Sequence, residues 1–257
     1  MTMNNYERRE NIFHPEKVRF VTQRMVVKIG SSTVTGGSDV LDVNFMENIA
    51  GQVGKLFKSG VKVIIVTSGA VAAGKKGLGE TNSILDKQVA ALYGQSELIS
   101  EWKQVLNNKG VEKVGQLLVT DNDLGNIDKV INRSLSFGVV VVNANDPVND
   151  YEMKQFLVSK DNDRLAGFIA KSIGADTLLL LTDVDGVLDK DGKVMDSFNS
   201  TQEVMIFSAS TSFGTGGMSS KVQIAQEFTG RAVIANGRAE DVELKVARGQ
   251  KIGTQFH

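Results

Sequence analysis

The segment VVKIGSS (26–32) places a lysine, Lys28, near the end of an apolar run and shortly before Gly30 and Ser31. In a Walker A loop the lysine instead follows the glycines, at the start of a helix. A lysine that ends a strand directs its ammonium over the edge of the sheet, and a glycine beside it lets backbone N–H groups approach an anion. Because apolar residues surround Lys28, a solvated surface role is disfavoured. We therefore interpret Lys28 as a candidate ligand for a phosphate.

A second candidate for phosphate binding is the glycine-rich segment GTGGMSSK (214–221), which leads into a predicted helix. The N–H groups and the dipole of a helix N-terminus favour a polyphosphate, and Lys221 adds a point charge. Glycine-rich hinges have a similar composition, so this segment alone is a weak indication. Together with Lys28 it would supply cations at both ends of the path of a transferred phosphoryl group.

Three polar residues, Asp161, Asn162 and Asp163, stand just before a predicted helix in SKDNDRLAGFIA (159–170). A single aspartate would suffice to cap that helix. The surplus favours a second role, which is either hydrogen bonding to the ammonium group of a substrate or orientation of the two lysines. The segment NAND (143–146), at another predicted strand end, offers a further carboxylate and two amides.

The two histidines, His14 and His257, lie near the ends of the chain, so its body has no imidazole to act as a general base. An alcohol acceptor would have to be deprotonated by an aspartate. A carboxylate acceptor needs no base, because its unperturbed pKa is about 4.3 and it is ionised at neutral pH. It needs only screening from the charge of a triphosphate, which two lysines and Mg²⁺ would supply. The sequence therefore favours transfer to a carboxylate.

These residues can act in one site only if the fold brings them to the same edge of a sheet. Six short apolar runs do not alternate with polar residues, which is typical of strands buried on both faces of a parallel sheet. Helical patterns lie between the runs, for example at 45–57 after a predicted cap at Asp42. This alternation predicts an α/β fold, a three-layer αβα sandwich with a mostly parallel central sheet. The runs are MVVKI (25–29), VKVIIV (61–66), VGQLLV (114–119), VVVVN (139–143), TLLLLT (177–182) and AVIA (232–235), and further helices are expected at about 84–106, 164–173, 219–229 and 240–248.

Polar or glycine-rich clusters follow four of these runs: KIGSS, TSGAVAAG, NANDP and TDVDG. In open α/β sheets, ligands bind outside the carboxyl ends of the strands. Each cluster alone is compatible with an ordinary turn, but four of them at one edge predict one large site.

The composition limits the classes of protein to which the chain can belong. The 257 residues are 41% hydrophobic and 23% charged, and nothing marks a linker, so we expect a single domain at 23–257 after a polar extension at 1–22. A net charge of −1 without a basic tract argues against nucleic acid as a partner. The chain has no cysteine, no signal-peptide pattern and no apolar run of the roughly 20 residues that a membrane span needs. It is therefore expected to be cytoplasmic, with no membrane contact.

Taken together, these motifs resemble those of the amino-acid kinase family over nearly the whole chain, from about Met25 to Phe256. The resemblance is to the members that phosphorylate L-glutamate. Its most specific motif is TSGAVAAG, because other members usually carry a different glycine-rich loop there. The matching segments, in the order of the family, are VVKIGSS, VTSGAVAAGKKGLG, KQVAALYGQSELISEW, LLLLTDVDG and GTGGMSSK.

The resemblance implies the amino-acid kinase fold, in which the N-terminal part binds the amino acid and the C-terminal part, from about residue 174, binds ATP. It implies ATP- and Mg²⁺-dependent phosphorylation of the side-chain carboxylate of L-glutamate to L-glutamyl 5-phosphate, the first step of proline biosynthesis. It further implies feedback by proline and a homo-oligomer, either a dimer or a tetramer.

By the same resemblance, Lys28 and Lys221 flank the transferring phosphoryl group, and Asp163 rather than Asp161 orients them. The glutamate site would comprise Ser68, Gly69, Asp146 and Asn162. No residue is expected to bind a metal directly. The nucleotide site would comprise Lys28, Gly30, Ser31, Thr182, Asp183, Thr215, Gly216, Gly217, Met218, Ser219, Ser220 and Lys221.

Some features depart from the pattern of the family. Its NEND is NAND here, with Ala144 for the acid, and its GDND is KDND, with Lys160 for the glycine. No C-terminal PUA domain, which many members carry, is expected. These changes affect regulation and oligomer contacts more than the reaction. Two alternatives remain: a kinase of this fold for another acceptor, such as isopentenyl phosphate or a nucleoside monophosphate, and a nucleotide-binding sensor without catalysis.

Overall fold

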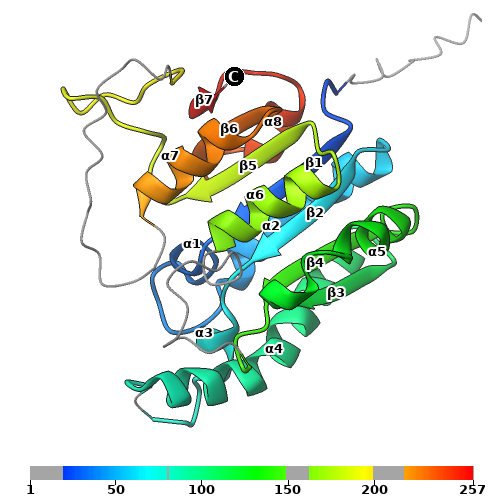
Figure 1. Cartoon of the computed structure of the whole chain (residues 1–257), viewed down its shortest axis with the longest axis vertical. Coiled ribbons are helices and arrows are strands. Elements are labelled where there is room, and N and C mark those ends of the chain that lie inside the picture. The colour runs from blue at the N-terminus through cyan, green and yellow to red at the C-terminus, as the bar shows by residue number, and fades with distance from the viewer. Residues whose placement is uncertain (1–19, 80, 149–161, 199–216, 257) are drawn as a thin grey trace, which may run out of the picture.

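The computed structural model describes residues 20–79, 81–148, 162–198 and 217–256. Within these ranges seven strands form one sheet: β1 (Arg24–Ile29), β2 (Lys62–Thr67), β3 (Val114–Val119), β4 (Val139–Ala144), β5 (Thr177–Thr182), β6 (Arg231–Asn236) and β7 (Thr254–Phe256). The strands lie in the order β3-β4-β2-β1-β5-β6-β7 (Figure 1). All neighbouring strands are parallel except β6 and β7.

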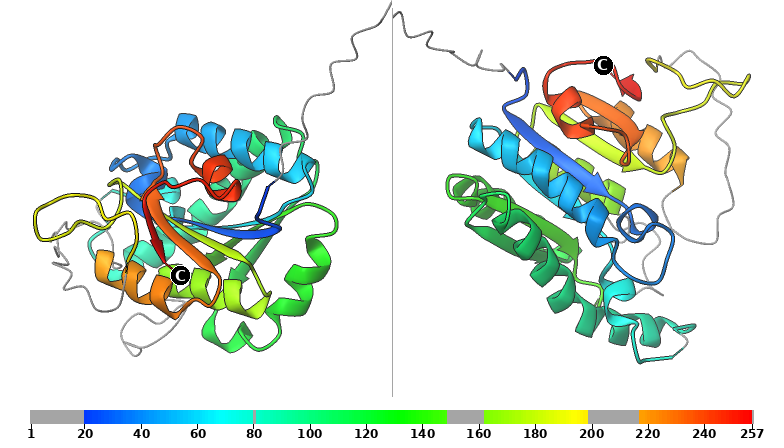
Figure 2. Two further views of the ribbon diagram at one scale, coloured as in Figure 1. Left: turned by 90° about the horizontal axis from the view of Figure 1, so that it is seen from above. Right: turned by 180° about the vertical axis from the view of Figure 1, so that it is seen from behind.

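Helices cover both faces of this sheet (Figure 2). Those in the described residues are α1 (Ser31–Thr35), α2 (Val43–Lys58), α3 (Ala70–Gly74), α4 (Ile84–Asn107), the 3-10 helix η1 (Asp121–Asp123), α5 (Ile127–Ser134), α6 (Asn162–Ser172), α7 (Met218–Glu227) and α8 (Val242–Ala247). None of them has both the length and the apolar character that crossing a membrane requires.

Each face of the sheet packs against its own apolar core. Met25 and Val27 of β1 point to the side of α2, α4 and α8, whereas Val26 points to the side of α5, α6 and α7. Successive side chains of a strand face opposite sides, so an uninterrupted apolar run serves both cores. The expected three-layer αβα sandwich with a mostly parallel sheet is confirmed.

The expected elements are present, but the sequence analysis did not predict the short helices α1, α3, η1 and α5, and two strands differ from expectation. All six apolar runs are strands, and Asp42 caps α2 as predicted, since its Oδ1 accepts a hydrogen bond of 3.0 Å from the backbone N of Phe45. However, the prediction that every strand is buried on both faces is wrong for β3, whose Gly115 and Gln116 are exposed because β3 lies at the edge of the sheet. The antiparallel β7 was not expected, because three residues carry no periodic pattern.

Helices α3 and α4 cross in direct backbone contact. A Cβ added to Gly74 would overlap the carbonyl oxygen of Ala90, and a Cβ added to Gly94 would overlap that of Ala70. Only glycine therefore allows this approach. Because α3 begins two residues after Ser68, the crossing holds the polar loop that follows β2 against the 24-residue helix α4.

A buried carboxyl group lies between α2 and α8. Glu243 has no exposed surface, and neither of its carboxyl oxygens has a hydrogen-bond partner among the described residues. Its backbone N donates to Oε1 of Gln52 on α2, at 3.0 Å. Burial, and to a lesser extent the nearby charge of Asp241, raises the pKa of Glu243 to about 8. The folded protein therefore holds this group protonated at neutral pH.

This raised pKa predicts that the protein loses stability as the pH rises. Between about pH 4.5 and 8 the unfolded chain releases the proton of Glu243 while the folded chain keeps it, so the free energy of unfolding falls over this window and levels off above it. The slope contributed by one such group is on the order of 1 kcal/mol per pH unit. We expect Glu243→Gln, which cannot ionise, to remove this slope in denaturant titrations at several pH values.

The matched control is Glu240→Gln, because Glu240 is exposed and belongs to the same segment of the chain. It should keep the slope of the original protein. An unchanged slope in Glu243→Gln would contradict the assignment of this pH dependence to Glu243.

Candidate active site

The parallel sheet places the residues after β1, β2, β4 and β5 at one edge. The register pairs Lys28 of β1 with Val66 of β2 on one side and with Leu180 of β5 on the other. The carboxyl ends of these strands are therefore level, and the polar clusters that follow them lie at the same edge. The same edge receives the N-termini of α6 and α7, which follow β4 and β5 in the chain.

Lys28, Asp163 and Lys221 form one buried ion cluster at this edge. Nζ of Lys28 lies 2.8 Å from Oδ1 of Asp163, and Nζ of Lys221 lies 3.0 Å from Oδ2. The Asp163 side chain has no exposed surface, and those of the lysines are only 7% and 9% exposed. Burial acts to raise the pKa of Asp163, but the two ammonium groups outweigh it and lower that pKa below its ordinary value. These three side chains thus bring two ammonium groups and one carboxylate together at neutral pH.

The three members come from three elements. Lys28 is the fifth residue of β1, Asp163 is the second residue of α6, and Lys221 is the fourth residue of α7. The carboxylate of Asp163 contacts both lysines, so its role is not limited to capping the helix, which was the competing interpretation. Charges this deeply buried persist when they are paired, and two ammonium groups at one sheet edge suit a polyanionic ligand.

The start of α7 lies beside this cluster and suits an anion. The N-cap of α7 is Gly217, which has no side chain to cap the first turn. The backbone N–H groups and the dipole of this helix therefore point toward the same edge as Lys221. Met218 and Ser220 are half-buried and Ser219 is exposed. Thr215 and Gly216, which were predicted to bind the nucleotide, lie outside the described residues.

Ser68, Gly69 and Asn162 lie together, and Asn162 directly precedes Asp163 in the chain. Nδ2 of Asn162 donates to Oγ of Ser68 at 2.6 Å and lies 3.4 Å from the carbonyl oxygen of Thr67. Oδ1 of Asn162 is buried and has no hydrogen-bond partner among the described residues. Gly69 has a φ of 114°, a backbone conformation that residues with a side chain rarely adopt. This arrangement presents a hydroxyl and an amide oxygen next to the ion cluster.

Asn162 also contacts a chain of buried amides that the sequence analysis missed. Its Nδ2 lies 3.4 Å from Oδ1 of Asn143, and Nδ2 of Asn143 lies 3.4 Å from Oε1 of Gln95 on α4. A signal for Gln95 was present in the sequence. It is a polar residue within an apolar helical stripe, in which Ala91 and Leu98 are its neighbours on the same face.

The remaining residues of the predicted site lie around these groups. Asp146 is half-buried in the turn after β4, whereas Asp161 lies outside the described residues. Thr182 ends β5 and is half-buried, and Asp183 is exposed beside it. Gly30 begins α1, and a Cβ added there would lie 3.3 Å from Nζ of Lys28. Gly30 thus leaves space next to this ammonium, and Ser31 follows it with an exposed side chain.

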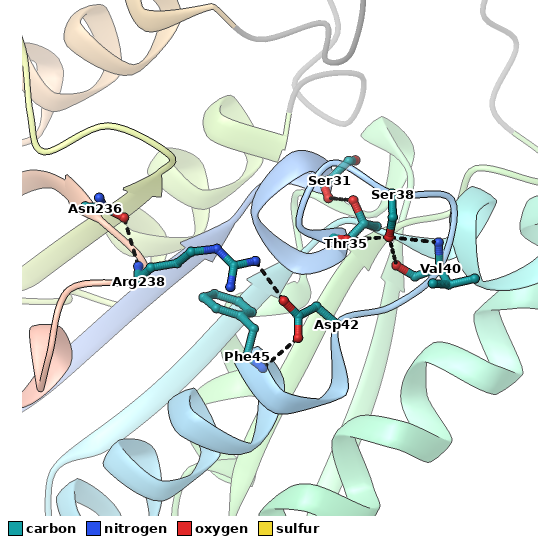
Figure 3. Close-up of polar contacts among 8 residues, drawn as sticks. All are labelled: Ser31, Thr35, Ser38, Val40, Asp42, Phe45, Asn236 and Arg238. Carbon is teal, nitrogen blue, oxygen red and sulfur yellow. Dashed lines mark hydrogen bonds and ion pairs between the residues drawn. The ribbon is translucent and has the colours of Figure 1, made fainter.

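An ion pair braces the α1–α2 loop against the end of β6 (Figure 3). Nη2 of Arg238 donates to Oδ2 of Asp42 at 2.8 Å, and the guanidinium lies 5.2 Å from the ring centre of Phe45. The backbone N of Arg238 donates to Oδ1 of Asn236, whose Nδ2 donates to Oδ1 of Asp185. These contacts fix the turns after β5 and β6 relative to the start of α2. The sequence analysis identified the cap at Asp42 but not its partner, because 196 residues separate the two.

Comparison with known proteins shows the family to which the chain belongs. Residues 23–235 match the family described as the amino acid kinase family. The chain is 37% identical over 255 residues to the glutamate 5-kinase of Caldanaerobacter subterraneus subsp. tengcongensis, covering 91% of this chain and 67% of that protein. It is 36% identical over 256 residues to the glutamate 5-kinase of Shewanella amazonensis, covering 91% and 66%. The chain thus spans about two thirds of the length of these curated relatives.

A solved structure is similar in fold. The crystal structure of UMP kinase from Bacillus anthracis superimposes with a TM-score of 0.61, covering 92% of this chain and 96% of that one. The two sequences are 15% identical, so the likeness concerns the fold alone.

Proposed function

Because the chain belongs to the amino acid kinase family, we propose that it phosphorylates the side-chain carboxylate of L-glutamate with ATP. The product is L-glutamyl 5-phosphate, and the reaction is the first step of proline biosynthesis. The observation that carries this proposal is the buried cluster in which Asp163 holds Lys28 and Lys221 at the carboxyl edge of the sheet. The glutamate 5-kinases that resemble the chain over 91% of its length support the choice of acceptor.

In the proposed reaction, one oxygen of the glutamate side chain attacks the γ-phosphorus of ATP. The bond from this phosphorus to the β,γ-bridging oxygen breaks, and ADP leaves with that electron pair. No proton has to be removed, which fits a cluster of two lysines and one ionised aspartate without a general base. Lys28 and Lys221 stabilise the charge that moves between donor and acceptor, and Asp163 sets their positions.

The proposal divides the site between the two halves of the chain. Ser68, Gly69, Asp146 and Asn162 would bind glutamate, with Asp146 or a neighbouring acid on its ammonium group. The buried Oδ1 of Asn162 supports this, because it is an acceptor that faces no described donor. The nucleotide would lie over the part of the chain from about residue 174, against Thr182, Asp183, the segment 215–221, and Gly30 and Ser31 from the first half.

Mg²⁺ belongs to the proposal as a companion of ATP. In the described residues no group of three or more histidine, aspartate or glutamate side chains is placed to hold a metal ion. Asp163 is engaged by two lysines. Mg²⁺ commonly keeps several waters and binds through substrate phosphates, so the chain does not need a cage of its own. The ion would neutralise charge on the triphosphate.

An acceptor panel tests the proposed function. With ATP, Mg²⁺ and hydroxylamine to trap acyl phosphates, we expect L-glutamate to yield a hydroxamate. N-acetylglutamate lacks the ammonium group and should be at least ~10-fold poorer, since a hydrogen bond to a charged group is worth roughly 1.5–3 kcal/mol. Higher turnover with N-acetylglutamate, or phosphorylation of isopentenyl phosphate or a nucleoside monophosphate instead, would overturn the assignment.

Feedback and assembly complete the proposal. We propose cytoplasmic action, weaker inhibition by proline than is usual for the family, and self-association of the chain. Ala144, which ends β4, and Pro147, which follows it, motivate the statement on proline, because they change the family's NEND segment and its exit. The exposed Leu85, Leu92 and Tyr93 of α4 motivate the statement on assembly. A proline titration in the same assay measures the inhibition, and strong inhibition at proline concentrations below the KM for glutamate would contradict the statement on proline. Sedimentation velocity measures self-association, and a monomer would contradict the statement on assembly.

A further inference from the structure

Gln95 is a buried amide on the inner face of α4, with only 6% of its surface exposed. Its Nε2 donates to the carbonyl oxygen of Ala144 at 3.1 Å. Its Oε1 lies 3.4 Å from two amide nitrogens, Nδ2 of Asn143 and Nε2 of Gln116. One side chain on the outer layer of helices thus holds two consecutive residues at the end of β4 and one residue of the edge strand β3.

These contacts continue to the proposed acceptor site. Oδ1 of Asn143 accepts from its neighbour, the backbone N of Ala144, at 2.8 Å, which fixes the orientation of the Asn143 amide. The same oxygen lies 3.4 Å from Nδ2 of Asn162, and that nitrogen donates to Oγ of Ser68 at 2.6 Å. The amide of Asn162 is therefore held between Ser68 and a neighbour whose own orientation depends on Gln95.

Packing alone does not account for an amide at this position. The neighbours of Gln95 on the same face of α4 include Leu98 and Trp102, which are buried in the apolar core. A leucine or methionine would fill such a place without the cost of removing an amide from water. The contact of Gly74 with Gly94 also fixes the position of the next residue, Gln95, relative to the loop after β2. The amide is thus both costly to bury and rigidly placed.

We infer that Gln95 is a positioning residue for the phosphoryl acceptor. It holds the end of β4 so that Asn143 orients Asn162, whose Oδ1 then faces the acceptor. This inference rests on the proposed function, because it takes the neighbourhood of Asn162 and Ser68 as the acceptor site. It separates two groups of residues: Gln95 acts on the binding of the acceptor, whereas the ion cluster of Lys28 and Lys221 acts on phosphoryl transfer.

The first test replaces Gln95 by methionine, which keeps the length of the side chain and removes every hydrogen bond. We expect the KM for L-glutamate to rise about 10-fold, the effect of losing one or two hydrogen bonds, with the KM for ATP changed less than about 2-fold. The matched control is Gln104→Met, the same change at an exposed position of α4, which should leave both values unaltered. Equal changes in both KM values, or an unchanged KM for glutamate, would overturn the inference.

The second test is Gln95→Glu, which also serves if the methionine variant does not fold. A protonated carboxyl group can donate to the carbonyl oxygen of Ala144 as the amide does, but a carboxylate cannot. Burial raises the pKa of such a carboxyl group, so its proton should be lost within the range in which the enzyme can be assayed. We expect the KM for glutamate in Gln95→Glu to rise from pH 6 to pH 8.5, where that of the original protein stays level. A side chain that only fills space would show no such difference, and parallel pH profiles would contradict the inference.

The acceptor that the original protein phosphorylates distinguishes a failure of the proposed function from a failure of the inference on Gln95. If it phosphorylates another acceptor, the proposed function fails, and the KM for that acceptor decides the role of Gln95. If it phosphorylates glutamate and the variants show unchanged glutamate KM values, the inference alone fails. If no acceptor in the panel is phosphorylated, both fail.

Discussion

Replacement of Lys28 or Lys221 by alanine is expected to lower kcat by about 100-fold or more. Each ammonium lies within 3.0 Å of the Asp163 carboxylate in a site with little exposed surface. A charge placed in such a dry environment stabilises a transition state by roughly 3 kcal/mol, which corresponds to about two powers of ten in rate. The effect should appear in kcat, because the charge that the lysines meet develops as the phosphoryl group moves.

The same substitutions also disturb the cluster, so the measurement needs a check on folding. Removal of one lysine takes away one of the two ammonium groups that contact Asp163, and breaking a buried ion pair typically costs roughly 3–5 kcal/mol of stability. Activity should therefore be measured by initial rates at a temperature where circular dichroism shows the variant to be folded. Lys171→Ala is the control, because this exposed lysine lies 3.9 Å from Glu227 and away from the cluster. Near-normal kcat in a folded Lys28 or Lys221 variant would remove that lysine from the mechanism.

Asp163→Asn is expected to abolish most turnover while the protein remains folded and still binds ATP. An asparagine has one oxygen for one lysine, but its NH₂ group would face the other ammonium, and two donors cannot bond to each other. The lysines should then move apart, and we expect kcat to fall by about 100-fold. The KM for ATP should change much less, because the first turn of α7 and both lysines remain.

The competing account of Asp163 is that it only begins α6. A capping role is worth about 1 kcal/mol, and asparagine caps almost as well as aspartate. That account predicts a stable and active Asp163→Asn variant. Activity within about 2-fold of the original protein would therefore sink the mechanistic role of the charge. Thermal unfolding of the same preparation reports the stability change separately from the rate.

The central strands could be predicted because their signal is local. An uninterrupted run of Val, Ile and Leu, as in β4 and β5, is compatible with few environments other than a strand between two layers of helices. The position of Lys28 at the edge of the sheet followed from the same reasoning, whereas the grouping of Lys28 with Asp163 rested on the resemblance to the amino-acid kinase family, because Asp163 stands before a helix and not at a strand end. The sequence could not indicate that β3 would be half exposed, since the edge of a sheet depends on the order of strands and not on local pattern.

Side-chain partners far apart in the chain could not be predicted in the same way. Arg238 meets Asp42 across 196 residues, and Gln95 meets Ala144 across 49. Neither the arginine nor the glutamine belongs to a periodic pattern from which its partner could be predicted. The sequence left the role of Asp163 open between a cap and an ion-pair partner, because both need a carboxylate at the start of a helix. The distances from Asp163 to Lys28 and Lys221 identify it as an ion-pair partner, which the sequence alone could not do.

The position of β1 in the sheet has a consequence for how the protein is made. β1 leaves the ribosome before the other strands of its sheet, but Met25 pairs with Thr177, which is synthesised about 150 residues later. At roughly 5–20 residues per second this delay is on the order of 10–30 s. During that time β1 can pair with β2 while its other edge, which will carry β5, has no partner from its own chain. Such an edge can pair with a neighbouring nascent chain. Because contacts of this sequence separation form slowly, the strand that carries Lys28 is the segment for which protection by a chaperone during translation would matter most.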